Sequence, residues 1–462
     1  MTFLKYLNFF LPAPHIARLP QEEVNAKYKK IRWQVFIGIT LGYTGFYLVR
    51  NNFAFAMPYL AQQGFTKTQL GLIFSALPLA YGLSKFLMAI VSDRSNPRYF
   101  MATGLILSTM ANFFYGSSLV LHSFILMLLV LFFNGWAQGM GWPALARVMV
   151  HWFSRNERGT KMSIIGAMQS ISRSIIGPLI VLGISFFGSW HSIFYFPAII
   201  ALVAVALVLL LVRDTPQSEG LPPIEEYHNE YRGNEPGCLS TTDRERELTP
   251  KEILFKYIFV NKYLWYLSAA DIFVHLVRYG IISWAPTYLN GAKGFTLAES
   301  GLACFLYEIA AIPGVLLCGW LSDKIFHGRR TPICIIYMVG AFFAIMLYWF
   351  VPVGAHLYDK VALAAIGFFI YGPAKLIGVC ALEVVPKKAA GTAAGLTGLL
   401  GHAGGTTMAY IGIGSIVDSF GWDAGFVMLL IACALAILAL AFTWNFESVK
   451  PPLFIFAKNK KL

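Results

Sequence analysis

The sequence predicts an all-α polytopic membrane protein, with twelve transmembrane helices arranged as two pseudo-symmetric six-helix bundles. Three observations lead to this prediction: the composition, the number of long apolar segments and an internal repeat. Of the 462 residues, 57% are hydrophobic and only 13% are charged, and the mean hydropathy is +0.62. Soluble globular chains carry about 25% charged residues. The composition therefore excludes a soluble protein.

Apolar segments long enough to cross a bilayer, which takes about 20 residues, occur in two groups of six. They lie near residues 33–57, 69–92, 98–117, 122–147, 159–187 and 191–212, and near 262–290, 298–322, 331–351, 360–385, 391–417 and 421–444. The long polar interval between the groups holds ten acidic and five basic residues and is typical of a linker. We expect a cytoplasmic N-terminal tail, a first bundle, a cytoplasmic linker, a second bundle and a cytoplasmic C-terminal tail at residues 1–32, 33–213, 214–257, 258–445 and 446–462.

The basic residues predict the orientation in the membrane. The chain has 36 Lys and Arg against 23 Asp and Glu. Three of the 36 fall in loops after odd-numbered segments, five lie within segments, and 28 lie in the termini and the even-numbered loops. Cytoplasmic loops of membrane proteins carry such an excess, so it does not indicate nucleic-acid binding. Both termini and the linker are expected in the cytoplasm.

An internal repeat relates the two groups of segments. Four short motifs recur in the same order at offsets of 228, 230, 230 and 232 residues: Leu48-Val49-Arg50 and Leu276-Val277-Arg278, Ser92-Asp93-Arg94 and Ser322-Asp323-Lys324, Pro143-Ala144 and Pro373-Ala374, Gly159-Thr160 and Gly391-Thr392. The constant order and offset favour a true repeat over coincidence. Two halves of the same topology are typical of a transporter whose site lies between them.

Charged residues inside the apolar segments are the candidates for that site. Five bases stand against three acids: Arg50, Lys85, Arg173, Arg278 and Lys375 against Asp271, Glu308 and Glu383. A buried arginine is costly in a membrane, and at least two of these bases lack an acidic partner. A structural arginine paired with a carboxylate is the alternative interpretation. A dianionic phosphate would supply the missing charge, because guanidinium groups bind its oxygens bidentately.

Further motifs resemble a known family. They are Pro12-Ala13-Pro14-His15, Tyr47-Leu48-Val49-Arg50, Asn52 to Leu60, Val91 to Arg98, Gly139-Met140-Gly141-Trp142-Pro143, Arg213 to Ser218, Leu221 to Tyr227 and Pro386 to Thr392. Over nearly the whole chain, the sequence is similar to the organophosphate:phosphate antiporter family of the major facilitator superfamily, and within it to the glycerol-phosphate carriers. The resemblance implies phosphate binding by Arg50 and Arg278, in a site lined by Lys85, Tyr43, Tyr47, Tyr81 and Tyr371.

The resemblance also implies an activity. It implies import of an organic phosphate, with glycerol 3-phosphate favoured, in exchange for inorganic phosphate by alternating access in a bacterial inner membrane. A hexose-6-phosphate antiporter and a non-transporting sugar-phosphate sensor of the same family are the alternatives. The Asp and Lys that mark hexose-phosphate carriers are missing from the eleventh segment, where Gly395, Thr397 and Gly398 stand.

The chain departs from the family pattern at several site positions. Gly166 and Gln169 replace an Asn and a His, and Arg173 stands one helical turn later, where the family has Gly. His275 and His402 replace tyrosines, and Lys375 is additional. Arg173 and Lys375 either pair with an acid or line a wet cavity, or they face the site and indicate a larger or more negative ligand.

Other motifs predict no further chemistry. The sequence has no phosphate-binding Gly-rich loop, no metal-ligand spacing and no nucleophile motif, so we expect neither an enzyme nor a cofactor. The six cysteines have no disulfide spacing. Charges in the loops after the second and eighth segments are interpreted as gating groups on the cytoplasmic face, namely Asp93, Arg94, Arg98, Asp323 and Lys324. We expect a monomer in a lipid bilayer.

Overall fold

The computed structural model describes residues 10–92, 95–228, 253–326, 329–385 and 390–444, and all regular structure in these ranges is helical. The first half contains α1 (Gln21–Leu48), α2 (Asn52–Gln62), α3 (Lys67–Ser92), α4 (Pro97–Tyr115), α5 (Ser118–Leu121), α6 (Phe124–Gln138), α7 (Gly141–Trp152), α8 (Arg155–Phe187) and α9 (Ser192–Leu211). The described part of the connection to the second half contains the short helices η2 (Pro216–Glu219), α10 (Ile224–Tyr227) and η3 (Ile253–Ile258).

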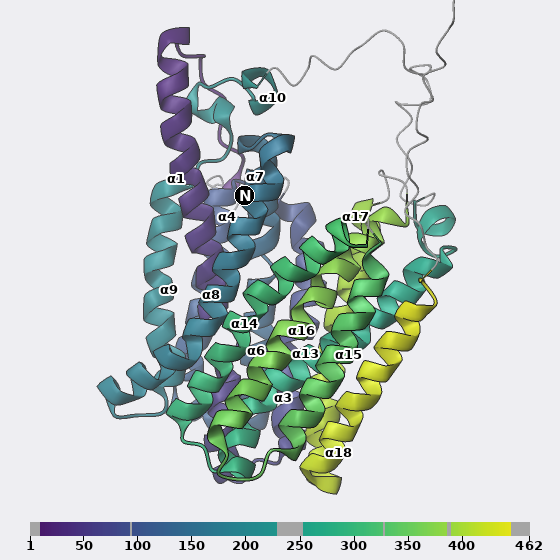
Figure 1. The fold of residues 1–462 in the computed structure, drawn as a ribbon. Coiled ribbons are helices and arrows are strands. Elements are labelled where there is room, and N and C mark those ends of the chain that lie inside the picture. Colours follow the sequence, from purple (N-terminus) through teal and green to yellow (C-terminus); the bar gives the residue numbers. More distant parts are fainter. Residues whose placement is uncertain (1–9, 93–94, 229–252, 327–328, 386–389, 445–462) are drawn as a thin grey trace, which may run out of the picture.

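The second half contains seven elements. They are α13 (Lys262–Lys293), α14 (Leu297–Lys324), α15 (Arg330–Phe350), α16 (His356–Glu383), α17 (Ala390–Leu399), the π-helix η5 (Leu400–Thr406) and α18 (Thr407–Ala441). Helices of each half pack mainly against one another, so the chain forms two bundles (Figure 1). The principal contacts between the halves join α8 to α14, α3 to α18, α2 to α13, and α3 to η5.

Seven segments of the described chain are long and apolar enough to cross a membrane by length and composition alone. The longest, Gly395–Ala441, reverses direction at Gly421, whose φ of 80° is outside the helical region. A Cβ at Gly412 would lie 2.8 Å from the Met428 side chain, whereas residues 16 apart in a straight helix are about 24 Å apart. This segment therefore crosses twice, and α1, α3, α4 and α13 bring the crossings to the predicted twelve.

Local sequence signals explain several helix ends. Asn96 accepts a hydrogen bond from the backbone N–H of Arg98 and precedes Pro97 at the start of α4. At the start of α14, Thr296 and Glu299 form a reciprocal capping box. Gly294, in the left-handed conformation with φ of 72°, ends α13.

Helix α1 begins at Gln21, within the segment expected to be a tail, and so extends beyond the apolar sequence. Its first turns pack on the described start of the linker, since the ring of Tyr28 stacks on Tyr227 with centroids 4.1 Å apart and meets Trp152 edge-on at 6.0 Å. The N-terminal segment before α1 follows the same surface, where Arg18 forms a bidentate pair with Glu226. The first bundle and the start of the linker thus form one folded unit.

The two halves meet closely at one end of the molecule. Gly177 of α8 and Gly301 of α14 lie backbone to backbone, and Gly71 of α3 lies against the carbonyl of Tyr410 in α18. A Cβ at Gly71, Gly177 or Gly301 would meet the facing backbone, so glycine permits this approach. The opposite end carries α10 and the start of the linker (Figure 1). We call this close contact between the halves the seam. Charged residues of both halves meet between the seam and the opposite end, at the centre of the molecule.

Candidate functional site

Arg50 lies at a break in the first crossing, between α1 and α2. The carbonyl oxygen of Val49 accepts hydrogen bonds from the side-chain amides of Asn112 at 2.8 Å and Asn134 at 3.1 Å. Gln138 donates to the carbonyl of Phe46 at 3.0 Å. Side chains of α4 and α6 thus donate hydrogen bonds to backbone carbonyls that would accept from backbone N–H groups in a continuous helix. The break directs Arg50 to the interior.

The equivalent position in the second half is organised differently, because Arg278 lies inside the continuous helix α13. Its carbonyl accepts a hydrogen bond from the Tyr307 hydroxyl at 3.2 Å. At the repeat offset of 230, the polar residues that brace the first break have apolar counterparts: Met338, Phe342, Ala364 and Phe368 correspond to Ser108, Asn112, Asn134 and Gln138. The second half therefore has no amides to hold a similar break open at this point.

Aromatic rings surround both arginines. The guanidinium carbon of Arg50 lies 4.5 Å from the ring centroid of Tyr47 and 4.6 Å from that of Tyr81. That of Arg278 lies 4.0 Å from the Tyr371 ring and 4.9 Å from the Tyr279 ring. Cation–π contacts stabilise a guanidinium without neutralising it. Each of the two arginines therefore keeps its full positive charge.

Both arginines keep unused donors. Nη2 of Arg50 and Nε of Arg278 are buried without a hydrogen-bond partner. Nε of Arg50 donates a hydrogen bond to Oε1 of Gln138 at 2.9 Å. In the described part of the chain neither arginine forms an ion pair with a carboxylate. Buried donors are normally satisfied, so this pair of cations fits an anion that accepts several hydrogen bonds.

Two lysines add charge beside the arginines. Nζ of Lys85 lies 5.8 Å from the Tyr81 ring centroid and 5.5 Å from that of Trp142. Lys375 is exposed although it lies within α16, and its ammonium interacts electrostatically with Arg278, Arg173 and Lys85. Among the described residues neither lysine has an ion-pair partner. Lys375 therefore lines solvent-accessible space next to the arginines.

Arg173 joins the two halves through an acid. Its Nε lies 3.0 Å from Oε2 of Glu308, and the pair is buried. The Tyr371 hydroxyl donates to the other carboxylate oxygen of Glu308 at 2.5 Å. Arg173 thus has the acidic partner that one of the two sequence interpretations expected, and its charge is compensated across the interface of α8 and α14.

Gln169 and Tyr43 lie on the first-half side of the cluster. The Tyr47 hydroxyl donates to Oε1 of Gln169 at 3.4 Å. Tyr43 is buried and packs edge-on against Tyr47, with centroids 5.5 Å apart, and against Trp142 at 5.9 Å. Gln169 therefore contacts the site through Tyr47, and Tyr43 supports the rings around Arg50.

His275 and His402 lie together on the second-half side of the cluster. Nδ1 of His275 lies 3.1 Å from Oδ1 of Asp271 and 3.0 Å from the Asp271 carbonyl oxygen. The rings of His275 and His402 meet edge to face with centroids 4.8 Å apart. His402 in turn meets the Tyr81 ring of the first half at 5.7 Å. The substrate-site candidates of the sequence analysis thus lie in one cluster built from both halves.

The expected gating residues lie at helix ends and loops away from the central cluster. Asp93 and Arg94 lie outside the described residues. The guanidinium of Arg98, in the first turn of α4, lies 5.4 Å from the Tyr99 ring. Asp323 is 3.8 Å from Arg330 and Lys324 is exposed. The described members of this set belong to the loop ends and not to the central cluster.

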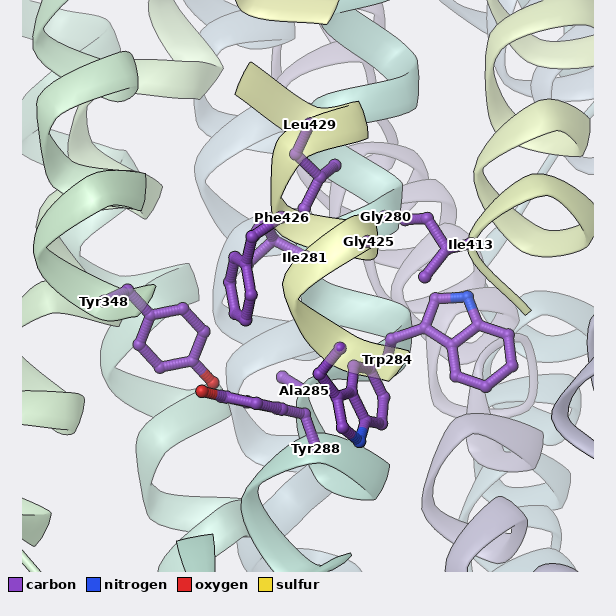
Figure 2. A pocket seen from close by; sticks show the side chains of 11 residues that line it. Gly280, Ile281, Trp284, Ala285, Tyr288, Tyr348, Ile413, Gly425, Phe426 and Leu429 are labelled. Carbon is purple, nitrogen blue, oxygen red and sulfur yellow. The ribbon is translucent and has the colours of Figure 1, made fainter. Parts of the chain in front are cut away.

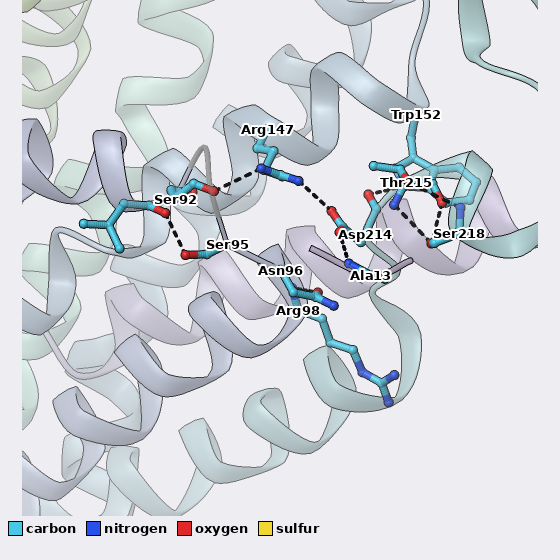
Figure 3. Close-up of polar contacts among 11 residues, drawn as sticks. Ala13, Ser92, Ser95, Asn96, Arg98, Arg147, Trp152, Asp214, Thr215 and Ser218 are labelled. Atoms are coloured by element: carbon cyan, nitrogen blue, oxygen red, sulfur yellow. Dashed lines mark hydrogen bonds and ion pairs between the residues drawn. The ribbon is translucent and has the colours of Figure 1, made fainter. Parts of the chain in front are cut away.

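Figure 3 shows a second polar network at the end where the linker starts. Arg147 donates to Oδ1 of Asp214 at 3.1 Å and to the carbonyl of Ser92 at 3.3 Å. Asp214 also accepts from the backbone N–H of Ala13 at 2.8 Å, and its carbonyl accepts from the Trp152 indole at 3.0 Å. This network ties the N-terminal segment and the linker to α3 and α7, apart from the central cluster.

Sequence reasoning missed the residues that hold the site residues in place. Gln138, Asn134, Asn112 and Ser108 form a buried polar chain that ends at Arg50, and Tyr279 stacks near Arg278. A comparison of the two halves of the sequence indicates these four polar residues, because each of them is polar whereas the residue 230 positions later is apolar. Tyr279 follows Arg278 directly and gives no such signal.

The described residues offer no metal site, since they contain no group of three or more His, Cys, Asp and Glu side chains that could hold an ion. A separate cavity between α13, α15 and α18 is lined by aromatic and aliphatic side chains, among them Trp284, Tyr288, Tyr348 and Phe426 (Figure 2). This lining contains no cation. The cavity therefore does not suit an anion, and the central cluster remains the candidate site.

A multi-pass helical membrane protein with two repeated bundles and a cationic cluster between them defines a class, that of two-domain membrane carriers. Residues 39–409 match the model of the Major Facilitator Superfamily, and the chain belongs to this family. Among solved structures, a bacterial homolog of the human lysosomal transporter Spinster, described as inward-facing and unoccupied, matches with a TM-score of 0.71 at 17% identity, covering 90% of this chain and 99% of that chain. The predicted fold class is confirmed.

Curated relatives match over nearly the whole chain. The glycerol-3-phosphate transporter of Bacillus subtilis is 54% identical, covering 95% of this chain and 98% of the relative. That of Haemophilus influenzae is 45% identical, covering 93% and 94%. A probable hexose phosphate transport protein of Chlamydia pneumoniae is 40% identical over 95% of this chain and 97% of its own length, and the membrane sensor protein UhpC of Escherichia coli is 33% identical over 93% and 97%.

Proposed function

We propose that this protein imports glycerol 3-phosphate in exchange for inorganic phosphate, by alternating access across a bacterial inner membrane. The observation that carries the proposal is the pair formed by Arg50 and Arg278. Each lies in a different half, and each keeps a buried unused donor and no acidic partner in the described chain. A phosphate dianion satisfies both. The similarity to named glycerol-3-phosphate transporters supports the choice of organic phosphate.

The same arrangement accounts for obligatory exchange. A phosphate bound between Arg50 and Arg278 offsets the repulsion between two desolvated cations, so the halves can rotate around it. Without a ligand, repulsion between the two arginines opposes closure of the halves around the site. The empty carrier therefore does not turn back to the opposite side of the membrane.

The proposed site includes further residues from both halves. It is lined by Lys85, Tyr43, Tyr47, Tyr81, Gln169, Tyr371, His275 and His402, with Lys375 and Arg173 beside it. In this proposal the seam at Gly71, Gly177 and Gly301 faces outward. Both termini and the linker face the cytoplasm, and the carrier works as a monomer.

The test is exchange in proteoliposomes loaded with inorganic phosphate. Labelled glycerol 3-phosphate should enter with the unmodified protein, and Arg50→Lys and Arg278→Lys should each abolish entry, because lysine lacks the planar fork of donors. Arg18→Lys is the matched control, since Arg18 pairs with Glu226 on the exposed surface. Retained exchange in both site variants would overturn the proposal.

A second candidate is a hexose-6-phosphate antiporter. It is favoured by Lys375, an exposed residue that interacts electrostatically with Arg278 and adds a positive charge for a larger or more negative ligand. Counterflow from phosphate-loaded vesicles against glycerol 3-phosphate, glucose 6-phosphate and phosphoenolpyruvate distinguishes the substrates. A third, a sensor that binds without turnover, is excluded if cells carrying only this protein accumulate the labelled substrate.

A further inference from the structure

Three titratable groups, Asp271, His275 and His402, lie together at the edge of the central cluster beside the two arginines. Asp271 and His275 are 4% and 5% exposed on α13, one helical turn apart. His402 lies on η5, and its ring meets that of His275 at 4.8 Å between centroids. The hydrogen bonds of His275 run through Nδ1 to Asp271. With a proton on Nδ1, Nε2 of His275 is an acceptor.

The local fold brings these groups together. A Cβ at Gly401 would collide with the Asp271 carboxylate and would lie 3.0 Å from Nδ1 of His275. A Cβ at Gly405 would collide with the backbone of Ile272 and would lie 3.0 Å from Cβ of His275. The two glycines therefore let η5 approach α13 at the level of the acid and the histidine. Short π-helices such as η5 occur frequently at functional sites.

We propose that Asp271, His275 and His402 form a proton-binding site, and that a proton is taken up there when an organic phosphate dianion binds. The inference rests on the function proposed above. An imidazole is the side chain that ordinarily accepts a proton near neutral pH, and Nδ1 of His275 lies 3.1 Å from Oδ1 of Asp271.

The charges that face the histidines explain why ligand and proton bind together. His402 interacts electrostatically with His275, and with three cations: Lys85 of α3, Arg278 of α13 and Arg50. Two tyrosine rings also contact the histidines: Tyr81 of α3 meets His402, and Tyr279 of α13 meets both His275 and His402.

A phosphate dianion bound by Arg50 and Arg278 adds two negative charges to this group. The dianion offsets the repulsion between these cations and a proton on the histidines, and so makes protonation of the proton-binding site more favourable. Linkage is reciprocal, so a proton at this site must strengthen phosphate binding by the same factor. Within the histidine range, the affinity for the dianion should therefore rise as the pH falls.

The test measures protons taken up for each ligand bound. Purified protein in weakly buffered detergent solution receives labelled glycerol 3-phosphate between pH 6 and pH 8, with a pH indicator present. The comparison is the double variant His275→Tyr/His402→Tyr, which keeps a ring at both positions. The ligand's own titration is the same in both samples and cancels in the difference. We expect the unmodified protein to take up more protons per bound ligand, by up to about one near the ordinary histidine pKa of ~6.5.

Each outcome decides between the alternatives. Equal proton counts in the two proteins overturn the proton site and leave the exchange function standing, whereas absence of phosphate exchange in the unmodified protein removes the proposed function itself. Asp271→Asn should lower the proton count while both histidines remain. If the double variant does not bind ligand, His402→Tyr alone is measured in the same way, and an unchanged count again overturns the proposal.

Discussion

Gln138 holds Arg50 in place through a neutral acceptor. Its Oε1 accepts a hydrogen bond from Nε of Arg50 at 2.9 Å, while its Nε2 donates to the carbonyl of Phe46 at 3.0 Å and to Oγ of Ser108 at 2.7 Å. The amide thus fixes the guanidinium relative to the end of α1 without cancelling its charge. A carboxylate in this position would pair with Arg50 and compete with the ligand.

Replacing Gln138 should therefore weaken phosphate binding. A hydrogen bond to a charged group contributes about 1.5–3 kcal/mol, so we expect Gln138→Leu to lower the affinity for glycerol 3-phosphate roughly 10- to 100-fold. Gln138→Glu should lower it further. Binding to purified protein measures both variants, with the exposed Gln62→Leu as the control. An unchanged affinity in Gln138→Leu contradicts the positioning role.

The repeat allowed the sequence to predict both the fold and its two central cations. The sequence indicates Arg50 and Arg278 because the same tripeptide recurs in an apolar background, where a charge is costly. The excess of bases over acids in the apolar segments is also evident from the sequence alone. Composition and internal symmetry therefore predict the class of protein and the kind of ligand.

Other features depend on side chains meeting across distant segments. No local signal places Glu308 beside Arg173, since the two lie 135 residues apart and on different halves. The break before Arg50 arises because Asn112 and Asn134 take the Val49 carbonyl. Sequence periodicity describes which face of a helix is apolar, but it does not describe which partner a buried amide finds.

The Arg173 and Glu308 pair provides a second prediction. Removing one member of a buried ion pair leaves an uncompensated charge and costs about 3–5 kcal/mol, so Arg173→Gln and Glu308→Gln should each lower the thermal stability in detergent. The double variant leaves no unpaired charge. It should lose about 1–3 kcal/mol less than the sum of the single variants. Additive losses in thermal unfolding would show that the two side chains do not interact.

The cap of α14 provides a third prediction. The Glu299 carboxylate accepts hydrogen bonds from the backbone N–H and the hydroxyl of Thr296, and its other oxygen lies 3.0 Å from Nδ1 of His356. A hydrogen bond contributes about 1 kcal/mol to stability, so Glu299→Ala should lower the melting temperature in detergent. Glu299→Gln keeps an acceptor and should lower it less. Equal melting temperatures for Glu299→Ala and the unmodified protein would contradict this role of the cap.

Asp418 joins the two halves at the closed end of the seam, at the turn inside α18 and outside the apolar crossings. Its carboxylate accepts hydrogen bonds from the backbone N–H groups of Lys67 and Thr68 at 3.1 and 2.5 Å and from the Thr68 hydroxyl at 2.7 Å. Burial raises the pKa of Asp418, but these hydrogen bonds outweigh burial and lower it. The ionised form therefore stabilises the closed seam, and this contribution is lost as the pH falls through the lowered pKa.

Asp418→Ala should open this end of the molecule, since the start of α3 loses its partner on the other half. A net loss of about 1–2 kcal/mol for these hydrogen bonds corresponds to a roughly 5- to 30-fold increase in the open population. Spin labels at the exposed positions Gln69 and Phe420 measure the separation of α3 from α18. Asp423→Ala is the matched control, because Asp423 accepts a hydrogen bond of 2.7 Å from Trp349 within the second half. The same distance distribution in Asp418→Ala and the unmodified protein, or an equal shift in the control, would show that Asp418 does not hold the seam.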